Sequence, residues 1–159
     1  MIIYVDADAC PVKAEVYRVA QRYELPVKLV SNTWMRVPDE GDISLIIVED
    51  NPDAADDWIA EAAGAGDIVI TADIPLADRA LRRGARALSP RGRIFDDDSI
   101  GEALATRDLL AHLRETGTMT GGPPPFAKRD RSQFLRRLDE TIHAIRRERG
   151  GPHSGPAPG

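Results

Sequence analysis

The sequence predicts an α/β fold, with a mostly parallel sheet of four to five strands, helices on both faces of that sheet and a helical extension at the C-terminus. Three observations predict it. Short apolar runs alternate with helical patterns over the first 90 residues, as is typical of parallel strands joined by helices. After Pro90 the patterns are those of helices. The chain has 159 residues, of which 42% are hydrophobic and 30% charged, which is ordinary for one globular domain.

The strands are predicted from short apolar runs bounded by Gly, Pro or acidic residues. Continuous apolar runs of about four to eight residues are typical of strands that are buried on both faces. The predicted strands are residues 2–5, 27–30, 43–48, 67–71 and a short fifth at 85–88.

Helices are predicted where apolar residues recur at helical spacing. Pro11 suits the first turn of the first helix. Ser99, with Glu102 three residues later, has the pattern of a capping box. The last helix has an apolar stripe that runs from Phe134 to Ile145. The predicted helices are residues 11–22, 54–63, 74–83, 100–115 and 130–149.

One domain is predicted over residues 1–149, followed by a tail at 150–159. The tail contains only Gly, Pro, His, Ser and Ala, so we expect it to be disordered. Residues 121–125 are Gly and Pro only and predict a stiff loop before the last helix.

The sequence indicates a cytoplasmic protein with no membrane segment. Its longest purely aliphatic run, residues 45–48, is far shorter than the ~20 residues that span a bilayer. Asp6 and Asp8 interrupt the apolar N-terminus, which argues against a signal peptide. Cys10 is the one cysteine, so an internal disulfide and a multi-cysteine zinc site are excluded.

The charge is unevenly distributed along the chain. Residues 126–149 contain eight Lys or Arg and four Asp or Glu, a net +4, whereas the rest of the chain carries a net −9. A basic segment on an acidic body suits an enzyme whose arginines bind phosphate near catalytic carboxylates. It equally suits a solvated helix face, and charge alone leaves both interpretations open.

Carboxylates follow three of the first four predicted strands. Asp6 and Asp8 follow the first strand, Asp50 the third and Asp73 the fourth. In a parallel sheet these strand ends share one edge, where open α/β sheets bind ligands. Two carboxylates ~5 Å apart repel by roughly 3 kcal/mol, so such a group either has raised pKa values or holds a cation. Oxygen ligands suit Mg²⁺ or Mn²⁺, and such ions can activate water and stabilise the leaving oxygen of a phosphodiester.

Several of these acids also have structural interpretations. Asp73 and Asp53 each precede a predicted helix and suit its N-cap. Of Asp56 and Asp57, inside one helix, we expect one to point inward and the other to solvent. Asp6 is harder to explain structurally, because an acid at the end of an apolar strand needs a partner.

Residues that suit nucleic-acid contact follow the second strand and precede the last helix. Asn32 and Arg36 are candidate phosphate contacts. Trp34 suits either stacking on a base or burial in the core. The basic residues before the last helix suit contact with a phosphate backbone; they are Lys128, Arg129 and Arg131.

Four segments of the sequence resemble the YaiI/YqxD family of bacterial proteins. They are VDADACPVK, ITADIPLAD, LSPRGR and TGGPPPF followed by DRSQFL, and the resemblance covers roughly residues 1–149. The family is grouped with the PIN-like nuclease superfamily. The resemblance therefore implies a three-layer Rossmann-like sheet and a ribonuclease site that depends on Mg²⁺ or Mn²⁺.

The resemblance also implies roles for individual acids. Asp6 matches the first-strand acid of the superfamily, and Asp73 the acid after a later strand. Asp56 is the candidate for the acid on the middle helix, so Asp6, Asp56 and Asp73 are the expected metal ligands. We expect Asp8 to act in catalysis together with Asp6 and Asp73. Two acids remain open as a fourth ligand, Asp78 and Asp98.

Two other functions fit the same residues. Val5-Asp6-Ala7-Asp8-Ala9, with Ser31 after the second strand, also resembles the haloacid-dehalogenase-like phosphatases. That resemblance implies Asp6 as a covalent nucleophile, Asp8 as general acid and base, and one Mg²⁺. Alternatively, the protein is a non-catalytic RNA- or ribosome-binding module that uses its arginine-rich C-terminal helix.

Overall fold

A six-stranded sheet forms the centre of the protein in the computed structural model, which describes residues 1–118 and 124–149. The strand order is β3-β2-β1-β4-β5-β6; the first five strands are parallel and β6 is antiparallel to β5. This confirms the predicted α/β class, with one strand more than the four to five predicted. The strands are β1 (Ile3–Asp6), β2 (Val27–Ser31), β3 (Ile43–Ile47), β4 (Ile68–Ile70), β5 (Arg86–Leu88) and β6 (Ile94–Phe95).

The described helices lie close to their predicted positions. A single 3-10 turn, η1 (Ala7–Ala9), follows β1 directly. The predicted tail at 150–159 and most of the predicted loop at 121–125 lie outside the described residues. The α-helices are α1 (Lys13–Tyr23), α2 (Ala54–Ala62), α3 (Ile74–Arg82), α4 (Ile100–Glu115) and α5 (Lys128–Arg149).

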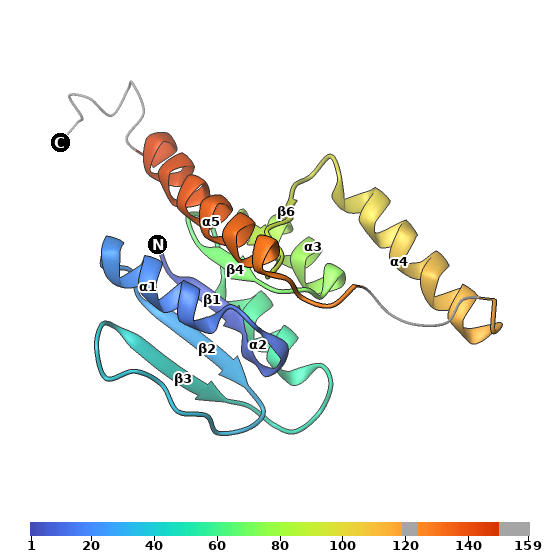
Figure 1. The fold of residues 1–159 in the computed structure, drawn as a ribbon, viewed down its shortest axis with the longest axis horizontal. Coiled ribbons are helices and arrows are strands. Elements are labelled where there is room, and N and C mark those ends of the chain that lie inside the picture. The colour runs from blue at the N-terminus through green and yellow to red at the C-terminus, as the bar shows by residue number, and fades with distance from the viewer. Residues whose placement is uncertain (119–123, 150–159) are drawn as a thin grey trace.

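Helices cover both faces of the sheet, which gives three layers (Figure 1). Successive side chains of a strand point to opposite faces, and β1 shows this directly. Ile3 and Val5 pack in the cluster that includes residues of α1 and α5, whereas Tyr4 packs with residues of α2 and α3. Both faces of β1 are therefore apolar, as its continuous hydrophobic run predicts.

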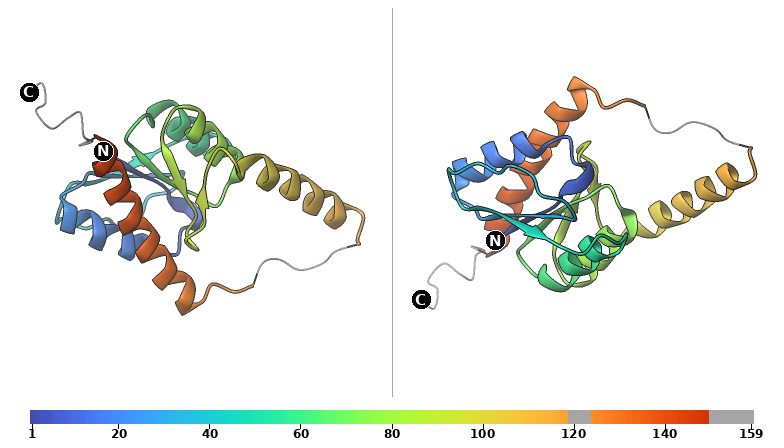
Figure 2. Two further views of the ribbon diagram at one scale, coloured as in Figure 1. Left: turned by 90° about the horizontal axis from the view of Figure 1, so that it is seen from above. Right: turned by 90° about the horizontal axis from the view of Figure 1, so that it is seen from below.

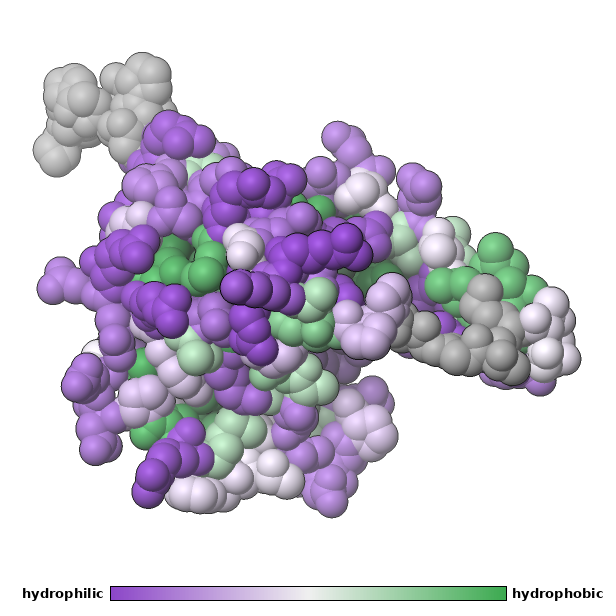
Figure 3. Space-filling view, in the orientation of Figure 1, coloured by the Kyte–Doolittle hydropathy of each residue, from purple (hydrophilic) through white to green (hydrophobic). Residues whose placement is uncertain are grey.

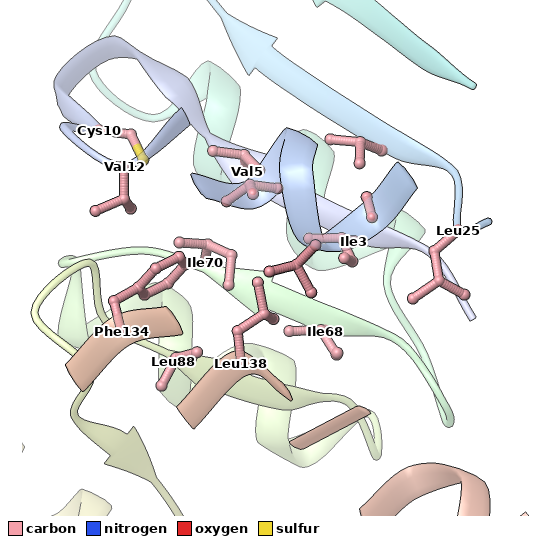
Figure 4. Packing of buried hydrophobic residues seen from close by; sticks show 14 of the residues in the cluster. Ile3, Val5, Cys10, Val12, Leu25, Ile68, Ile70, Leu88, Phe134 and Leu138 are labelled. Atoms are coloured by element: carbon pink, nitrogen blue, oxygen red, sulfur yellow. The ribbon is translucent and has the colours of Figure 1, made fainter. Parts of the chain in front are cut away.

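The C-terminal helix α5 belongs to the main core. Phe134, Leu138 and Ile142 are completely buried, which confirms the predicted apolar stripe. Figure 4 shows Phe134 and Leu138 directed at Ile68 and Ile70 of the sheet. The opposite face of α5 is hydrophilic (Figure 3). The extension is thus the second helix of this layer, beside α1.

Helix α4 extends away from the body of the protein, and both views in Figure 2 show this. Its first turn is packed, with Ile100 and Ala103 buried, but Leu109 is 56% exposed. The capping box predicted at Ser99 and Glu102 is wrong. Ser99 instead pairs with Asp96: its backbone N–H donates to Asp96 Oδ1 at 2.8 Å, and its hydroxyl accepts from the Asp96 N–H at 3.4 Å. Asp96 and Ser99 therefore form the two reciprocal hydrogen bonds of a capping box, one turn before the predicted one. None of the helices in the described ranges is both long and apolar enough to cross a membrane.

The unpredicted strand β6 forms a hairpin with β5 through a tight turn. Ser89 N–H donates to the Arg93 carbonyl at 2.8 Å, and Gly92 N–H donates to the Ser89 carbonyl at 2.9 Å. Gly92 closes the turn with a φ of +90°, and a Cβ there would lie 2.9 Å from the backbone of Gln133 and of Phe134 in α5. A three-residue hairpin loop needs glycine at such a left-handed position, and the close contact with α5 requires it as well.

Gly92→Ala is expected to destabilise the protein more than Gly66→Ala, a matched control. Gly66 has almost the same φ, +88°, but nothing lies within 4 Å of its added Cβ. Both variants have the left-handed strain of roughly 1–2 kcal/mol, and Gly92→Ala adds an overpacking cost of roughly 1–3 kcal/mol. Urea denaturation measures both free energies of unfolding. Equal losses would contradict the close packing of this hairpin on α5.

Candidate functional site

The candidate site lies at the edge of the sheet where the chain direction reverses. From β1 the chain continues to β2 and β3 on one side and returns to β4 on the other. Ligands of open α/β sheets bind at such a switch point, beyond the carboxyl ends of the strands. Asp6 is the last residue of β1, Ser31 is the last of β2, and Thr71 directly follows β4. The parallel pairing thus places these strand ends on one edge, as predicted.

Asp6 has the partner that its position after an apolar strand requires. The Thr71 hydroxyl donates to Asp6 Oδ2 at 2.9 Å. Burial raises the pKa of Asp6 from its ordinary value; the Thr71 bond opposes this, and the charges of Asp73 and Asp8 raise it further. Asp6 is therefore a partly desolvated carboxyl that neighbouring acids repel.

Asp8 lies on η1 and is held by the end of β2. The buried Ser31 hydroxyl donates to Asp8 Oδ1, and the Asn32 backbone N–H donates to Oδ2 at 3.2 Å. The Asn32 side chain donates to Asp50 Oδ1 at 3.3 Å. Asn32, predicted to contact phosphate, thus orients two acids in this structure.

Asp73 is the N-cap of α3, so the structural interpretation is confirmed for this residue. Its Oδ1 accepts from the Leu76 N–H at 2.9 Å, and its own N–H donates to the Thr71 hydroxyl at 3.0 Å. Its other carboxylate oxygen, Oδ2, accepts no hydrogen bond from any residue in 1–118 or 124–149. Capping therefore fixes the orientation of Asp73 and uses one of its two oxygens.

Asp56, in the first turn of α2, has the most strongly shifted pKa of the acids at this edge. Its pKa is raised to about 7, first by burial and then by the charges of Asp73, Asp6 and Asp53, while Arg79 lowers it. The neighbouring Asp57 faces outward and pairs with Arg79 at 2.8 Å. The expectation that one of the two acids points inward is confirmed.

The predicted cap at Asp53 is wrong. Asp53 occupies the N-cap position of α2, but its side chain makes no capping hydrogen bond. The Asn51 side chain accepts from the Asp53 N–H instead, at 3.1 Å. The carboxylate of Asp53 is thus available to act electrostatically on Asp56.

The two acids left open as a fourth ligand lie apart from this group. Asp78 pairs with Arg82 one turn along α3, at 3.1 Å, and Asp98 is exposed just before α4. The acids whose charges raise the pKa of Asp6 are Asp73 and Asp8, and those that raise the pKa of Asp56 are Asp73, Asp6 and Asp53; neither Asp78 nor Asp98 is among them. Asp53, which the sequence suggested as a helix cap and not as a ligand, therefore belongs to the group.

The donors suit Mg²⁺ or Mn²⁺, because all of them are carboxylate oxygens. As the side chains stand, no three His, Cys, Asp or Glu residues of the described segments converge closely enough to form a ready ligand set. The group consists of carboxylates that repel one another at moderate separation. Asp6, Asp56 and Asp73 are the members that a shared cation would draw together.

The predicted phosphate contacts lie in three different settings. Arg131 is already engaged, because its Nη1 donates to the Pro11 carbonyl at 3.0 Å and to Glu15 at 3.1 Å. Lys128 and Arg129 lie in the first turn of α5 rather than before it, and they line a surface hollow of about 510 Å³. Arg36 is exposed in the loop after β2.

Trp34, in the loop after β2, is 74% exposed. Burial in the core is therefore wrong for this residue. The loop that contains it begins at Ser31 and Asn32, the two residues that hold Asp8.

Thr71 is a positioning residue that sequence reasoning missed as a member of the site, and Ser31, which the sequence brought in only through the resemblance to phosphatases, has the same role. Both are buried hydroxyls at strand ends, and each donates to one acid of the group. Their signal was present, since each is the first polar residue after a run of apolar strand residues. Such a position is uncommon for a polar side chain unless it has a hydrogen-bond partner.

The fold and the site define an α/β protein with a doubly wound sheet and carboxylates gathered at its switch point. Within this class, the chain belongs to the YaiI/YqxD family. The family model described as "Uncharacterized BCR, YaiI/YqxD family" matches residues 4–144. The resemblance found in the sequence is thereby confirmed.

The curated relatives are similar over nearly their whole length. A "UPF0178 protein" of Parvibaculum lavamentivorans is 59% identical over 91% of this chain and 95% of its own. One from Paramagnetospirillum magneticum is 57% identical over 91% and 96%, and one from Caulobacter sp. is 56% identical over 92% and 97%. No solved structure matches the chain.

The raised pKa of Asp56 predicts how stability depends on pH. In the unfolded chain Asp56 releases its proton near pH 4, whereas in the folded protein it keeps the proton up to about pH 7. The folded state binds more protons in that window, so this group makes the free energy of unfolding fall as pH rises from about 4 to about 7. Asp56→Asn is expected to reduce that fall and to be more stable than wild type at pH 8.

Urea denaturation at pH 5 and pH 8 measures this effect. Asp39→Asn, in the exposed loop between β2 and β3, is the control and is expected to keep the wild-type difference between the two pH values. If Asp56→Asn kept it too, the electrostatic picture of the site would be wrong.

Proposed function

We propose that this protein is a metal-dependent nuclease that cleaves RNA at the edge formed by Asp6, Asp56 and Asp73. The main support is that carboxylates from β1, α2 and the start of α3 lie at the switch point of the sheet, near enough for Asp73 to raise the pKa of Asp6 and of Asp56. Carboxylates that are half-buried together are unfavourable unless a cation or a proton neutralises them. A divalent cation bound there supplies the neutralisation.

The side chains around these acids restrict them to defined orientations. The Thr71 hydroxyl fixes the orientation of the Asp6 carboxylate. The cap of α3 fixes the Asp73 carboxylate through Oδ1, so its Oδ2 is available to a metal ion. When bound, Mg²⁺ or Mn²⁺ lowers the pKa of a water and stabilises the leaving oxygen of a phosphodiester. In this proposal Asp8, exposed on η1 and oriented by Ser31 and Asn32, accepts a proton from an attacking water.

RNA as the substrate is supported by the resemblance to PIN-like nucleases and by the groups near this edge. Trp34 offers an exposed ring for stacking in the loop that starts at the Asp8 contacts. The hollow lined by Lys128, Arg129 and Arg136 at the start of α5 offers cations for phosphate.

A phosphatase is the second candidate, and one contact favours it. Ser31, the serine after the second strand in the phosphatase-like pattern, donates a hydrogen bond to Asp8. In that case Asp6 attacks the phosphorus atom and forms an aspartyl-phosphate, while the leaving oxygen takes a proton from Asp8.

Wild-type protein with Mn²⁺ is expected to cleave single-stranded or structured RNA from a mixed panel. Asp6→Asn and Asp73→Asn should each lower the rate by about 100-fold or more, because even a residue that only supports a metal ligand contributes roughly 10–100-fold. Each variant should also lose the increase in melting temperature that Mn²⁺ gives to the wild type. Asp39→Asn serves as the control and should behave as wild type in both assays.

Other outcomes would contradict the nuclease. Binding of Mn²⁺ without RNA cleavage, together with capture of beryllium fluoride on Asp6, would establish the phosphatase. RNA binding by the wild type that is lost in Lys128→Gln/Arg136→Gln, with no cleavage and no Mn²⁺ binding, would establish a binding module.

A further inference from the structure

A cavity of about 520 Å³ opens directly beside the acidic edge. It is lined by Ala9, the residue after Asp8, and by Ala72, the residue between Thr71 and Asp73. Its far side is the β5–β6 hairpin from Ser89 to Phe95. This volume lies in the range of pockets that hold small organic ligands, about 300–1,000 Å³. A molecule in the cavity would thus adjoin the proposed reaction site.

The cavity combines an apolar floor with two arginines. Pro11 and Ile74 contribute to the floor, and the buried ring of Phe95 lies beneath Arg93. Arg91 and Arg93 project from the hairpin into the lining. An apolar surface flanked by cations suits a ligand that has a flat hydrophobic part and an anionic part.

The two arginines differ in how their charges are balanced. Arg91 is fixed by Asp130 at 3.1 Å, by the Pro124 carbonyl and by the Phe126 ring 5.6 Å away. Arg93 is exposed and lies over the Phe95 ring at 5.1 Å. Across the two described ranges, no carboxylate forms an ion pair with Arg93. Arg93 therefore offers the cation that is not yet neutralised.

The position of Arg93 is set by the fold. Gly92 packs its backbone against Gln133 and Phe134 of α5, and the Arg93 N–H donates to the Ser89 hydroxyl at 3.0 Å. The hairpin is thereby anchored on both sides of the arginine. The backbone that bears Arg93 is therefore already ordered, so an anion that binds to this arginine does not have to order the hairpin.

We propose that this cavity binds one nucleotide of a single-stranded nucleic acid next to the bond cleaved at the acidic edge, with the base on the apolar floor and the phosphate on Arg93. The inference rests on the proposed function for the identity of the reacting bond. A base reaches such a floor only when it is unstacked, as in single strands. Arg93 also offsets the repulsion that the neighbouring acids exert on a phosphate.

The test measures binding without metal and without cleavage. A fluorescent single-stranded hexauridylate is titrated with Asp6→Asn/Asp73→Asn protein in EDTA, and anisotropy gives the affinity. Adding Arg93→Gln should weaken binding by about 10-fold, because a charge-assisted hydrogen bond to phosphate is lost. The slope of log affinity against log salt should fall by about 0.7, the value for one phosphate contact on a single strand.

Adding Arg107→Gln instead is the matched control, since this exposed arginine lies on the projecting helix α4. It should leave both affinity and salt slope unchanged. Matching melting temperatures for the two arginine variants would show that both are folded.

Each contrary result identifies what is wrong. Equal affinities for the two arginine variants, or no binding of the hexanucleotide, would overturn the inference. Duplex RNA that binds as tightly as the single strand would exclude an unstacked base. Uridine monophosphate that competes as well as the hexanucleotide would identify a free nucleotide as the ligand. Binding through Arg93 without Mn²⁺-dependent cleavage by the wild type would retain the nucleotide site and contradict the nuclease.

Discussion

The hydroxyl of Thr71 connects the two central strands to the acidic edge, and the geometry of the site depends on it. A hydroxyl has one hydrogen to donate and can also accept. Thr71 donates to Asp6 at the end of β1 and accepts from the N–H of Asp73 at the start of α3. It is buried between parallel neighbours, where an unpaired hydroxyl would be unfavourable. The same two bonds that satisfy Thr71 therefore fix the separation of the two acids.

Helix α5 couples this edge to the rest of the fold. Phe134 and Leu138 fill the core against β4. The backbone of Gln133 and Phe134 lies so close to Gly92 that a side chain at position 92 would have no room. The hairpin that bears Arg91 and Arg93 is thus held by the helix that completes the core. Because core packing tolerates little displacement, the distance from the hairpin to the acidic edge is fixed by the fold rather than by a mobile loop.

The sequence predicted those features whose signal is periodic or topological. Short, mainly apolar runs identified β1 to β5, and parallel pairing brought Asp6, Asp8 and Asp73 to one edge. The two-residue strand β6 is too short to give a pattern. Partners distant in the chain were also hidden: Arg131 pairs with Glu15 across 116 positions. Local composition cannot show that Arg131 already has an acidic partner. Nor can it show that Arg93, in a similar basic segment, has no acidic partner within the described residues.

Structural and functional roles need not exclude each other for an acid at a helix start. The cap of α3 needs one acceptor oxygen, and a carboxylate has two. Asp73 gives Oδ1 to Leu76 and retains Oδ2, so the cap orients the group that acts on Asp56. The cost appears at Asp56, whose pKa is raised to about 7 by burial and by these neighbours. A fold selected for stability alone would replace Asp56 with a neutral residue. Under the proposed function, a cation bound where these three elements meet would offset the unfavourable charge of Asp56.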